Sequence, residues 1–226
     1  MLSKSNPAEN ICVYSFHQQE GKGQFGRIWY SGRQNNISLS CLLHFHGFPA
    51  KSHFLLNKAI SASVVKFLED SFSINGLKIK WPNDIYFGEK KMGGLLVQNQ
   101  LSGANIKSSI IGLGLNVNED AFPEHLPNPV SLCQITTVKH ELINLSISMA
   151  DSLTTLLEAF LNRIPELNNY YLEHLLGYKQ LRDYRMPDGQ LLTGTIVSVN
   201  DLGKLNVNIA NNIHSFDHKE IEFILT

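Results

Sequence analysis

Lysine, asparagine and aspartate side chains interrupt an otherwise apolar stretch before the middle of the chain. The segment Lys80-Trp81-Pro82-Asn83-Asp84 lies between strand-like apolar residues, and Lys91 and Gly93-Gly94 follow it. Turn residues predict that two strands meet here in a hairpin, which places the polar groups at a strand end. A lysine held there costs desolvation free energy unless an anion meets it, and glycines let a ligand approach the backbone. The segment indicates an anion site, although a plain turn with solvated lysines fits it equally well.

Two further segments have the composition of ligand-binding elements. Gly21-Lys22-Gly23-Gln24-Phe25-Gly26-Arg27 combines glycines with cations, so its N–H groups and charges can surround a carboxylate or phosphate. It lacks the Lys-Ser/Thr ending of a nucleotide P-loop, and an ordinary flexible loop is the competing interpretation. Ile110 to Asn118 alternates glycine with apolar residues before it ends on asparagine, which predicts a buried strand that brings amides to a site.

In this order and at these separations, the three segments resemble the biotin protein ligases. The family's Gly-Arg-Gly-Arg-x-Gly loop is matched by Gly21 to Gly26, its Lys-Trp-Pro-Asn-Asp motif by Lys80 to Asp84, its downstream lysine by Lys91, and its Gly-x-Gly-x-Asn strand by Gly112 to Asn116. The resemblance implies that biotin is activated with Mg²⁺ and ATP to biotinyl-5′-AMP. It further implies transfer of biotin to a lysine of a biotin carboxyl carrier domain of a biotin-dependent carboxylase.

The resemblance also implies roles for individual residues. Lys91 would touch both the biotin carboxylate and the α-phosphate, Lys22 would lie opposite it, and Asp84 would orient the carrier lysine, so these three are the expected catalytic residues. Position 22 usually holds arginine in this family, and lysine keeps the charge but lacks the planar bidentate fork. The other expected biotin contacts are Gln18, Gly21, Gly23, Gln24, Gly93 and Gly94, and the expected ATP contacts are Arg27, Trp29, Asn83 and Asn116.

Structural interpretations compete with several of these roles. Trp29 fits plain core packing as well as a lid over the adenine, and Arg27 fits an exposed surface position. Asparagines at strand ends commonly satisfy backbone groups. Gln24 replaces a frequent second arginine, so we expect looser retention of the intermediate.

The chain departs from the family pattern ahead of Gln18, where no Ser-Thr-Asn segment is found to bind the ureido ring of biotin. The resemblance also implies a monofunctional form without a DNA-binding helix-turn-helix. Two other functions stay open: a lipoate-type acyl ligase or transferase, and a catalytically weak protein that binds biotin or a carrier domain. The intact motif at 80–84 disfavours the first, whereas the missing segment favours the second.

The composition limits the classes of partner that the protein can bind. With 226 residues, 43% of them hydrophobic, and a formal charge of −1, the chain can bury a substantial core but lacks the basic stripe that nucleic acid requires. Cys12, Cys41 and Cys133 have no metal or disulfide spacing, so we expect unpaired thiols in a reducing, cytoplasmic setting. No segment predicts a membrane span or a signal peptide. The sequence fits a monomer and a homodimer equally.

The hydrophobic pattern predicts an α+β fold with a mixed β-sheet and packed helices over 1–180, followed by a small barrel-like β module over 181–226. In the family these correspond to a catalytic domain of the class II aminoacyl-tRNA synthetase/biotin ligase type and an SH3-like C-terminal domain. Apolar spacing predicts an amphipathic helix over Leu142 to Leu161, with Ile164 continuing its apolar face, and Ser52 is the expected cap of another helix. The expected strands are 11–16, 37–45, 77–81, 85–87, 95–100 and 106–115 in the larger unit, and 191–199, 204–209, 213–216 and 221–225 in the smaller one.

Overall fold

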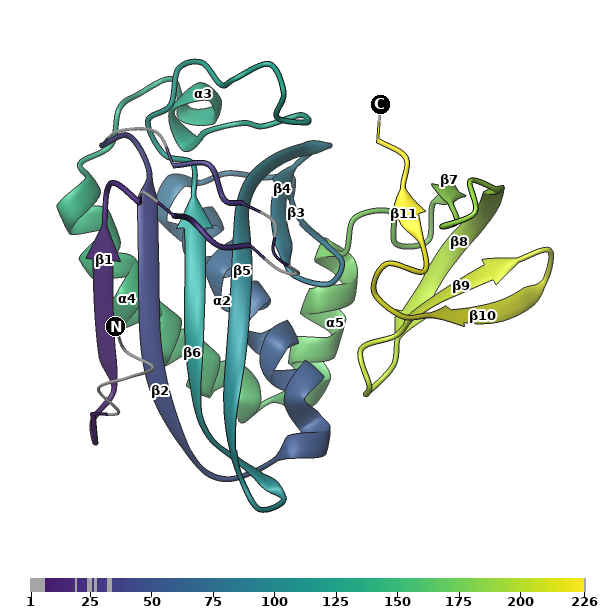
Figure 1. The fold of residues 1–226 in the computed structure, drawn as a ribbon, viewed down its shortest axis with the longest axis horizontal. Coiled ribbons are helices and arrows are strands. Elements are labelled where there is room, and N and C mark those ends of the chain that lie inside the picture. Colours follow the sequence, from purple (N-terminus) through teal and green to yellow (C-terminus); the bar gives the residue numbers. More distant parts are fainter. Residues whose placement is uncertain (1–6, 19, 24–25, 27, 32–33, 226) are drawn as a thin grey trace.

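The structure is a computed structural model that describes residues 7–18, 20–23, 26, 28–31 and 34–225. It contains a six-stranded sheet with packed helices and a separate five-stranded sheet at the C-terminal end, which confirms the α+β class (Figure 1). The larger sheet has the strand order β1-β2-β6-β5-β4-β3. Its strands are β1 (Ile11–Ser15), β2 (Ile37–Pro49), β3 (Leu77–Lys80), β4 (Asp84–Phe87), β5 (Lys90–Ser102) and β6 (Asn105–Leu115).

Each strand pairing of the larger sheet is antiparallel in the described residues, whereas a mixed sheet was expected. The strands β3 to β6 follow one another through short connections, and such connections join antiparallel neighbours. The long connection from β2 passes through a helix and enters the sheet at its far edge, so it forms no parallel pair with β2.

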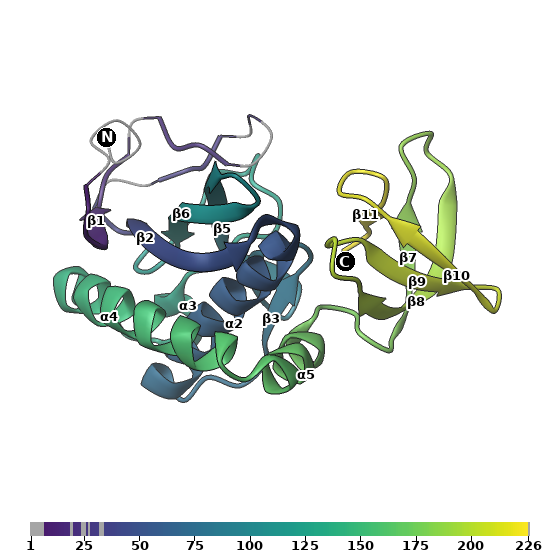
Figure 2. The same ribbon diagram turned by 90° about the horizontal axis from the view of Figure 1, so that it is seen from below.

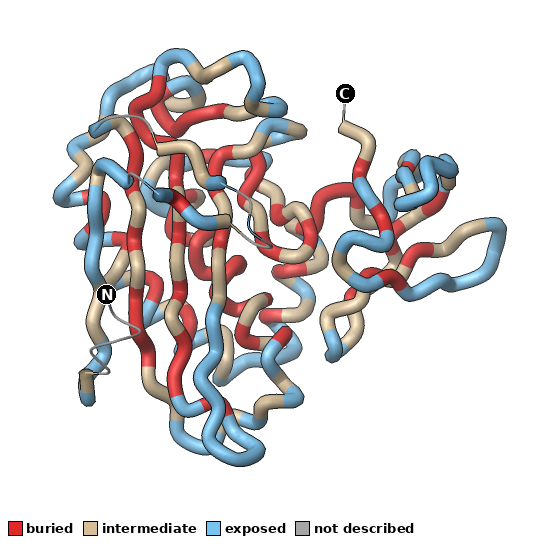
Figure 3. Tube along the Cα trace, in the orientation of Figure 1, coloured by how far each residue is buried: buried red, intermediate tan, exposed pale blue. Residues whose placement is uncertain are grey.

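Helices cover one face of the larger sheet, as Figure 2 shows. They are α2 (His53–Phe72), α4 (Leu142–Leu161) and α5 (Ile164–His174), and two shorter helices are η2 (Ala50–Ser52) and α3 (Leu132–Thr136). Side chains alternate along β2, so that Leu39, Cys41 and Leu43 are buried in the core. Buried positions accordingly concentrate in the strands and in α2 (Figure 3). These helices do not cover the opposite face of the sheet.

The helix expected over Leu142 to Leu161 is α4, but Ile164, which was expected to continue its apolar face, begins a second helix. α4 ends at Leu161, and α5 starts at Ile164 with proline in its first turn. Proline fits the first turn of a helix but not its interior, which explains the break. Ile164 is 43% exposed instead of facing the core. Ser52 is the N-cap of α2 as expected, but its side chain makes no capping hydrogen bond.

Cys12 and Cys41 form a disulfide, contrary to the expectation of unpaired thiols. The two residues lie directly opposite each other in the β1–β2 register, where Cβ atoms of antiparallel strands come within bonding reach of two sulfur atoms. The spacing of the cysteines in the sequence did not indicate this pairing, because the two residues meet only when β1 and β2 pair in the sheet. Cys133 is free and buried. No helix in the described part of the chain is long and apolar enough to cross a membrane.

The smaller sheet has the order β10-β9-β8-β7-β11, and its described pairings are antiparallel. Its strands are β7 (Leu181–Arg185), β8 (Leu191–Val199), β9 (Leu205–Ile209), β10 (Asn212–Phe216) and β11 (Glu222–Phe223). β7 was not expected from the sequence because Leu181 is 73% exposed and only Tyr184 of this strand is buried, so the strand lacks an apolar pattern.

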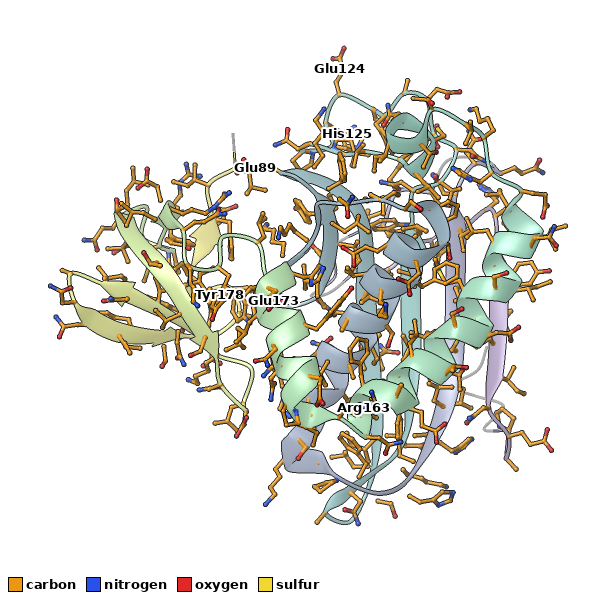
Figure 4. The ribbon with its side chains drawn as sticks, turned by 180° about the vertical axis from the view of Figure 1, so that it is seen from behind. Glu89, Glu124, His125, Arg163, Glu173 and Tyr178 are labelled. Atoms are coloured by element: carbon orange, nitrogen blue, oxygen red, sulfur yellow. A yellow bond between two sulfur atoms is a disulfide. The ribbon has the colours of Figure 1, made fainter. Side chains whose placement is uncertain are left out.

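The smaller sheet packs against the larger unit at the motif 80–84. The indole Nε1 of Trp81 donates a hydrogen bond of 2.9 Å to the carbonyl of Gly203, which lies in the turn before β9. Gly203 also lies directly against the ring of Phe54 at the start of α2. Arg182 forms an ion pair of 2.6 Å with Glu89, which Figure 4 shows on the turn of the larger sheet that faces the smaller one. The second sheet is therefore part of the environment of the motif.

Candidate functional site

A cavity of about 460 Å³ lies on the sheet face opposite the helices, and it brings together the three segments that the sequence singled out. The residues of those segments that line it are Lys22, Gly23, Lys80, Trp81, Pro82, Asn83, Asp84, Lys91, Gly94, Ile110, Gly112, Leu113 and Gly114. Gln18 and Trp29, which flank the glycine-rich segment, line it as well. They come from positions far apart in the chain, so only the folded sheet makes them neighbours.

Small residues on three neighbouring strands form the floor of the cavity. In the register of β2, β6 and β5, Ser38 pairs with Gly114, and Gly114 pairs with Gly94. The next row on the same face joins Ser40 to Gly112. Because alternate residues of a strand point to the same face, these glycines and serines give a nearly flat surface against which a ligand can lie.

Trp29 covers part of this floor. A Cβ atom at Gly114 would overlap the indole of Trp29, so position 114 must be glycine for the ring to lie there. The ring is held because the Trp29 N–H donates to the carbonyl of Gly21 at 2.9 Å, which folds the glycine-rich segment back on itself. The indole Nε1 is buried and has no hydrogen-bond partner in the described part of the chain. The ring therefore presents an unused donor beside the cavity.

Lys91 and Asp84 form the charged centre of the site. The Nζ atom of Lys91 lies 2.6 Å from Oδ2 of Asp84, and the two side chains are 30% and 28% exposed. The same ammonium lies 5.8 Å from the centre of the Trp29 ring. A Cβ atom at Gly94 would lie 3.0 Å from Oδ1 of Asp84, so glycine at 94 gives the carboxylate its room. Hydrogen bonds between the backbone of Lys91 and residues 128 and 130 fix the strand that carries it.

Other expected site residues have structural roles in the described chain. Asn83 is 2% exposed and donates to the carbonyl of Leu95, and it lines the cavity. Asn116 donates to the carbonyl of Val130 and lies beyond the residues that line the cavity. Gly93 is buried at the contact with β6. The ATP contacts expected from the two asparagines, and the biotin contact expected from Gly93, stay predictions.

The structure brings Lys22 and Gly23 to the cavity wall with Lys91. Gln24 and Arg27 lie outside the described residues. Sequence reasoning missed Ser38, Ser40 and His218, which also line the cavity. The alternation of serine with buried residues in 37–41 was a usable signal for the first two. His218 comes from the connection between β10 and β11, where its ring lies 5.7 Å from that of Trp81, and no local pattern could have found it.

The donor set of the site suits a magnesium ion that arrives with ATP. Within the described residues no group of three histidine, cysteine or acidic side chains is placed to hold a metal. Asp84 and Glu20 are the carboxylates among the residues that line the cavity. Mg²⁺ at nucleotide sites commonly keeps several waters and binds through substrate phosphates and one or two carboxylates, so this composition is compatible with it.

Residues 1–116 match the family model described as the biotin/lipoate A/B protein ligase family. The chain belongs to this family. Among curated proteins, it is 35% identical over 127 residues to the bifunctional ligase/repressor BirA of Bacillus spizizenii, a match that covers 55% of this chain and 38% of that protein. It is 33% identical over 115 residues to the human biotin–protein ligase, covering 47% of this chain and 15% of the human protein. The chain thus spans well under half of the length of these curated relatives.

Solved structures of biotin protein ligases share the fold. The enzyme of Aquifex aeolicus in complex with biotin and ATP superimposes with a TM-score of 0.76 at 24% identity, covering 95% of this chain and 89% of that one. The enzyme of Leishmania major in complex with biotinyl-5-AMP gives a TM-score of 0.62 at 18% identity, covering 96% and 92%. Both alignments extend over the smaller sheet as well as the larger one, since they cover nearly the whole chain.

Proposed function

We propose that this member of the biotin/lipoate ligase family is an ATP-dependent biotin protein ligase. It activates biotin to biotinyl-5′-AMP and transfers biotin to a lysine of a carboxyl carrier domain. The observation that carries the proposal is the convergence of Lys22, Lys91 and Asp84 on one cavity with a floor of glycine and serine. Such a floor suits a flat ligand, and the cations suit the two anionic groups that must react.

In the first step, a carboxylate oxygen of biotin attacks the α-phosphorus of ATP, and the bond from that phosphorus to the bridging oxygen breaks to release pyrophosphate. Two unit charges 4 Å apart repel by roughly 4 kcal/mol at an effective dielectric constant of 20, so cations must offset this repulsion. Lys91 is assigned to the carboxylate and the α-phosphate, and Lys22 to the opposite side. Fixed charges of this kind stabilise the charge that develops in the transition state.

In the second step, the carrier lysine attacks the carbonyl carbon of the adenylate, AMP leaves, and the amine loses a proton. A lysine amine has a reference pKa near 10.4, so it arrives protonated and needs a group that accepts its proton. Asp84 is assigned this role. Because Asp84 already holds Lys91 at 2.6 Å, it can accept the carrier amine only as Lys91 turns to the ligand phosphate.

The proposal divides the chain at about residue 180. The unit 1–180 contributes the floor, the glycine-rich segment and the charged centre, and the unit 181–226 contributes His218 at the side of Trp81. Mg²⁺ enters with ATP. The activity is assigned to the cytoplasm.

The test is to incubate the chain with biotin, Mg²⁺, ATP and a purified carrier domain, and to measure the mass of the carrier. A gain of one biotinyl group that requires ATP supports the proposal. A parallel reaction contains lipoate in place of biotin. Modification by lipoate alone would assign the site to the lipoate branch of the family, and no modification by either acid, together with no pyrophosphate exchange, would overturn the proposed activity.

A further inference from the structure

The floor of the cavity continues in one row across neighbouring strands, from β2 to β3. Each residue of this row is the direct partner of the next in the strand register, and each lines the cavity. In order, the row consists of Ser38, Gly114, Gly94, Asp84 and Lys80. Neighbouring strands lie about 4.8 Å apart, so the row is roughly 19 Å long. The cavity therefore extends to both sides of the charged centre.

The two ends of this row differ in what they offer a ligand. At the β2 end, Gln18 accepts a hydrogen bond of 3.2 Å from Ser38, and Gln18 is an expected biotin contact. At the other end lie Lys80 and His218, which both line the cavity. The ring of His218 lies 5.7 Å from that of Trp81. Of the described residues after 180, His218 alone lines the cavity, so it is the direct contribution of the smaller unit.

The turn that carries His218 is fixed by several contacts. The backbone N–H of Asp217 donates to Oε2 of Glu220 at 2.7 Å, and the N–H of Glu220 donates back to the carbonyl of Asp217 at 3.0 Å. The carboxylate of Asp217 forms an ion pair of 2.7 Å with Lys204. Lys204 belongs to the connection between β8 and β9 that hydrogen-bonds the motif 80–84. The histidine is therefore held in a defined position beside the motif.

The direction of the first reaction step determines which group lies at this end. In displacement at phosphorus, the attacking and leaving oxygens lie roughly in line. With the biotin head group at Gln18 and its carboxylate at Lys91, the pyrophosphate leaves away from Gln18, toward Lys80 and His218. The ammonium of Lys80 is held 5.5 Å from the ring centre of Phe223 in β11. An ammonium and an imidazole N–H both donate to phosphate oxygens, and such charge-assisted hydrogen bonds are strong.

We propose that His218 binds the pyrophosphate group of ATP by donating a ring N–H to one of its phosphate oxygens. The inference rests on the proposed ligase function and assigns the smaller unit a direct part in the nucleotide step. His218 forms no covalent bond. It holds the same group before the bond to the α-phosphorus breaks and after pyrophosphate has formed, so it acts on the forward and reverse directions of exchange.

Two substitutions separate hydrogen bonding from packing in biotin-dependent pyrophosphate exchange. His218→Phe keeps a ring beside Trp81 but has no N–H, and it should raise the KM values for magnesium pyrophosphate and ATP about 10- to 100-fold, as expected for one hydrogen bond to a charged group. His218→Gln keeps an N–H donor and should recover most of this loss. Biotin affinity, measured by calorimetric titration, should be unchanged in both variants. The matched control is His214→Phe, because His214 is exposed on β10 and lies outside the cavity lining.

Inhibition by AMP separates the two ends of the nucleotide. AMP lacks the pyrophosphate group, so its inhibition constant against ATP should be the same in His218→Phe and the wild type. Weaker inhibition by AMP with an unchanged KM for pyrophosphate would place adenosine beside His218 and overturn the inference. Equal losses in His218→Phe and His218→Gln, or no loss in His218→Phe, would overturn it as well. A wild-type chain without biotin-dependent exchange would instead overturn the proposed function, whatever the variants do.

Discussion

Lys91 and Asp84 lie where an ion pair contributes little to folding. Each side chain is about 30% exposed, at 30% and 28%, and ion pairs that remain hydrated typically add only about 0–1 kcal/mol to stability. The surrounding chain nevertheless keeps a glycine at position 94 to make room for the carboxylate, and glycine inside a strand costs roughly 0.5–1 kcal/mol relative to alanine. A structural role alone would not explain this arrangement. The chemistry proposed for the ammonium and the carboxylate accounts for it.

Asp84→Asn separates the two proposed steps. Without the carboxylate, Lys91 keeps its charge, so biotin-dependent pyrophosphate exchange should stay within about tenfold of the wild type. Transfer to the carrier should fall by about 10²–10⁴-fold, because the amine loses its proton acceptor. Single-turnover transfer from preformed adenylate measures the second step alone. Equal losses in exchange and transfer would show that Asp84 acts only by holding Lys91.

At the scale of elements, the strand β6 shows why glycine alternates through 112–114. The two glycines serve different purposes. At Gly114 a side chain would overlap Trp29, whereas at Gly112 a methyl group would meet its nearest described neighbours, the carbonyl oxygen and Cβ of Leu96, at 3.6 and 3.7 Å. We therefore expect the fold to tolerate alanine at 112. The space there is available for a ligand.

Gly112→Ala tests whether the floor carries the ligand. The substitution should keep or slightly raise the melting temperature. Alanine lowers the conformational entropy of the unfolded chain, which stabilises the folded state by about 0.4–1 kcal/mol. It should raise the KM for biotin, because the methyl group occupies the space above the floor. Gly114→Ala is the comparison variant, which should also displace Trp29 and change its fluorescence. Unchanged biotin KM in Gly112→Ala would place the ligand elsewhere.

The elements also show how far sequence reasoning reached. Alternating apolar residues predicted most strands, and the three segments that carry the resemblance do line one cavity. Contacts made only by folding were missed: the Cys12–Cys41 disulfide follows from strand register, and the antiparallel order follows from where the chain enters the sheet after α2. The proline next to Ile164 indicated a helix break there, but the apolar spacing continues across it and favoured one continuous apolar face.

At the scale of the whole molecule, the second sheet supports the motif 80–84. Gly203 accepts from Trp81 and lies against Phe54, so one turn of the small sheet contacts both the motif and the first turn of α2. Lys58 of α2 is buried nearby and donates to the carbonyl of Val199 at 3.4 Å. These contacts place the module where it can influence the cavity through Trp81.

Gly203→Ala should loosen this contact between the sheets. Gly203 has φ of 88°, and its Cβ atom would lie 2.5 Å from Cδ2 of Phe54. We expect a loss of about 1–3 kcal/mol in the free energy of unfolding from overpacking, and a higher KM for ATP. Gly189→Ala is the matched control, because Gly189 has φ of 87° but nothing within 4 Å of its Cβ position. Denaturant unfolding of both variants checks the difference, and equal destabilisation would mean that the Phe54 contact contributes nothing.

Burial lowers the pKa of Lys58, and this sets a pH dependence of stability. The unfolded chain holds the proton more tightly than the folded one, so the unfolding free energy rises with pH as pH passes the lowered folded pKa toward the unfolded value of 10.5. Below the lowered folded pKa the desolvation cost is fully present. Lys58→Met removes this contribution, so the wild type should gain stability relative to the variant as the pH rises toward 10.5. A pH-independent difference would contradict it.

Biotin-dependent exchange of pyrophosphate into ATP by Lys91→Ala tests the central claim most directly. The control is Lys90→Ala, which removes an exposed lysine at the adjacent position of β5. We predict that Lys91→Ala folds normally and loses about 10²–10³-fold in exchange rate, as expected for a preorganised charge, whereas Lys90→Ala stays near the wild type. A folded Lys91→Ala variant with near-wild-type exchange would contradict the account, because adenylate formation would then not depend on this ammonium.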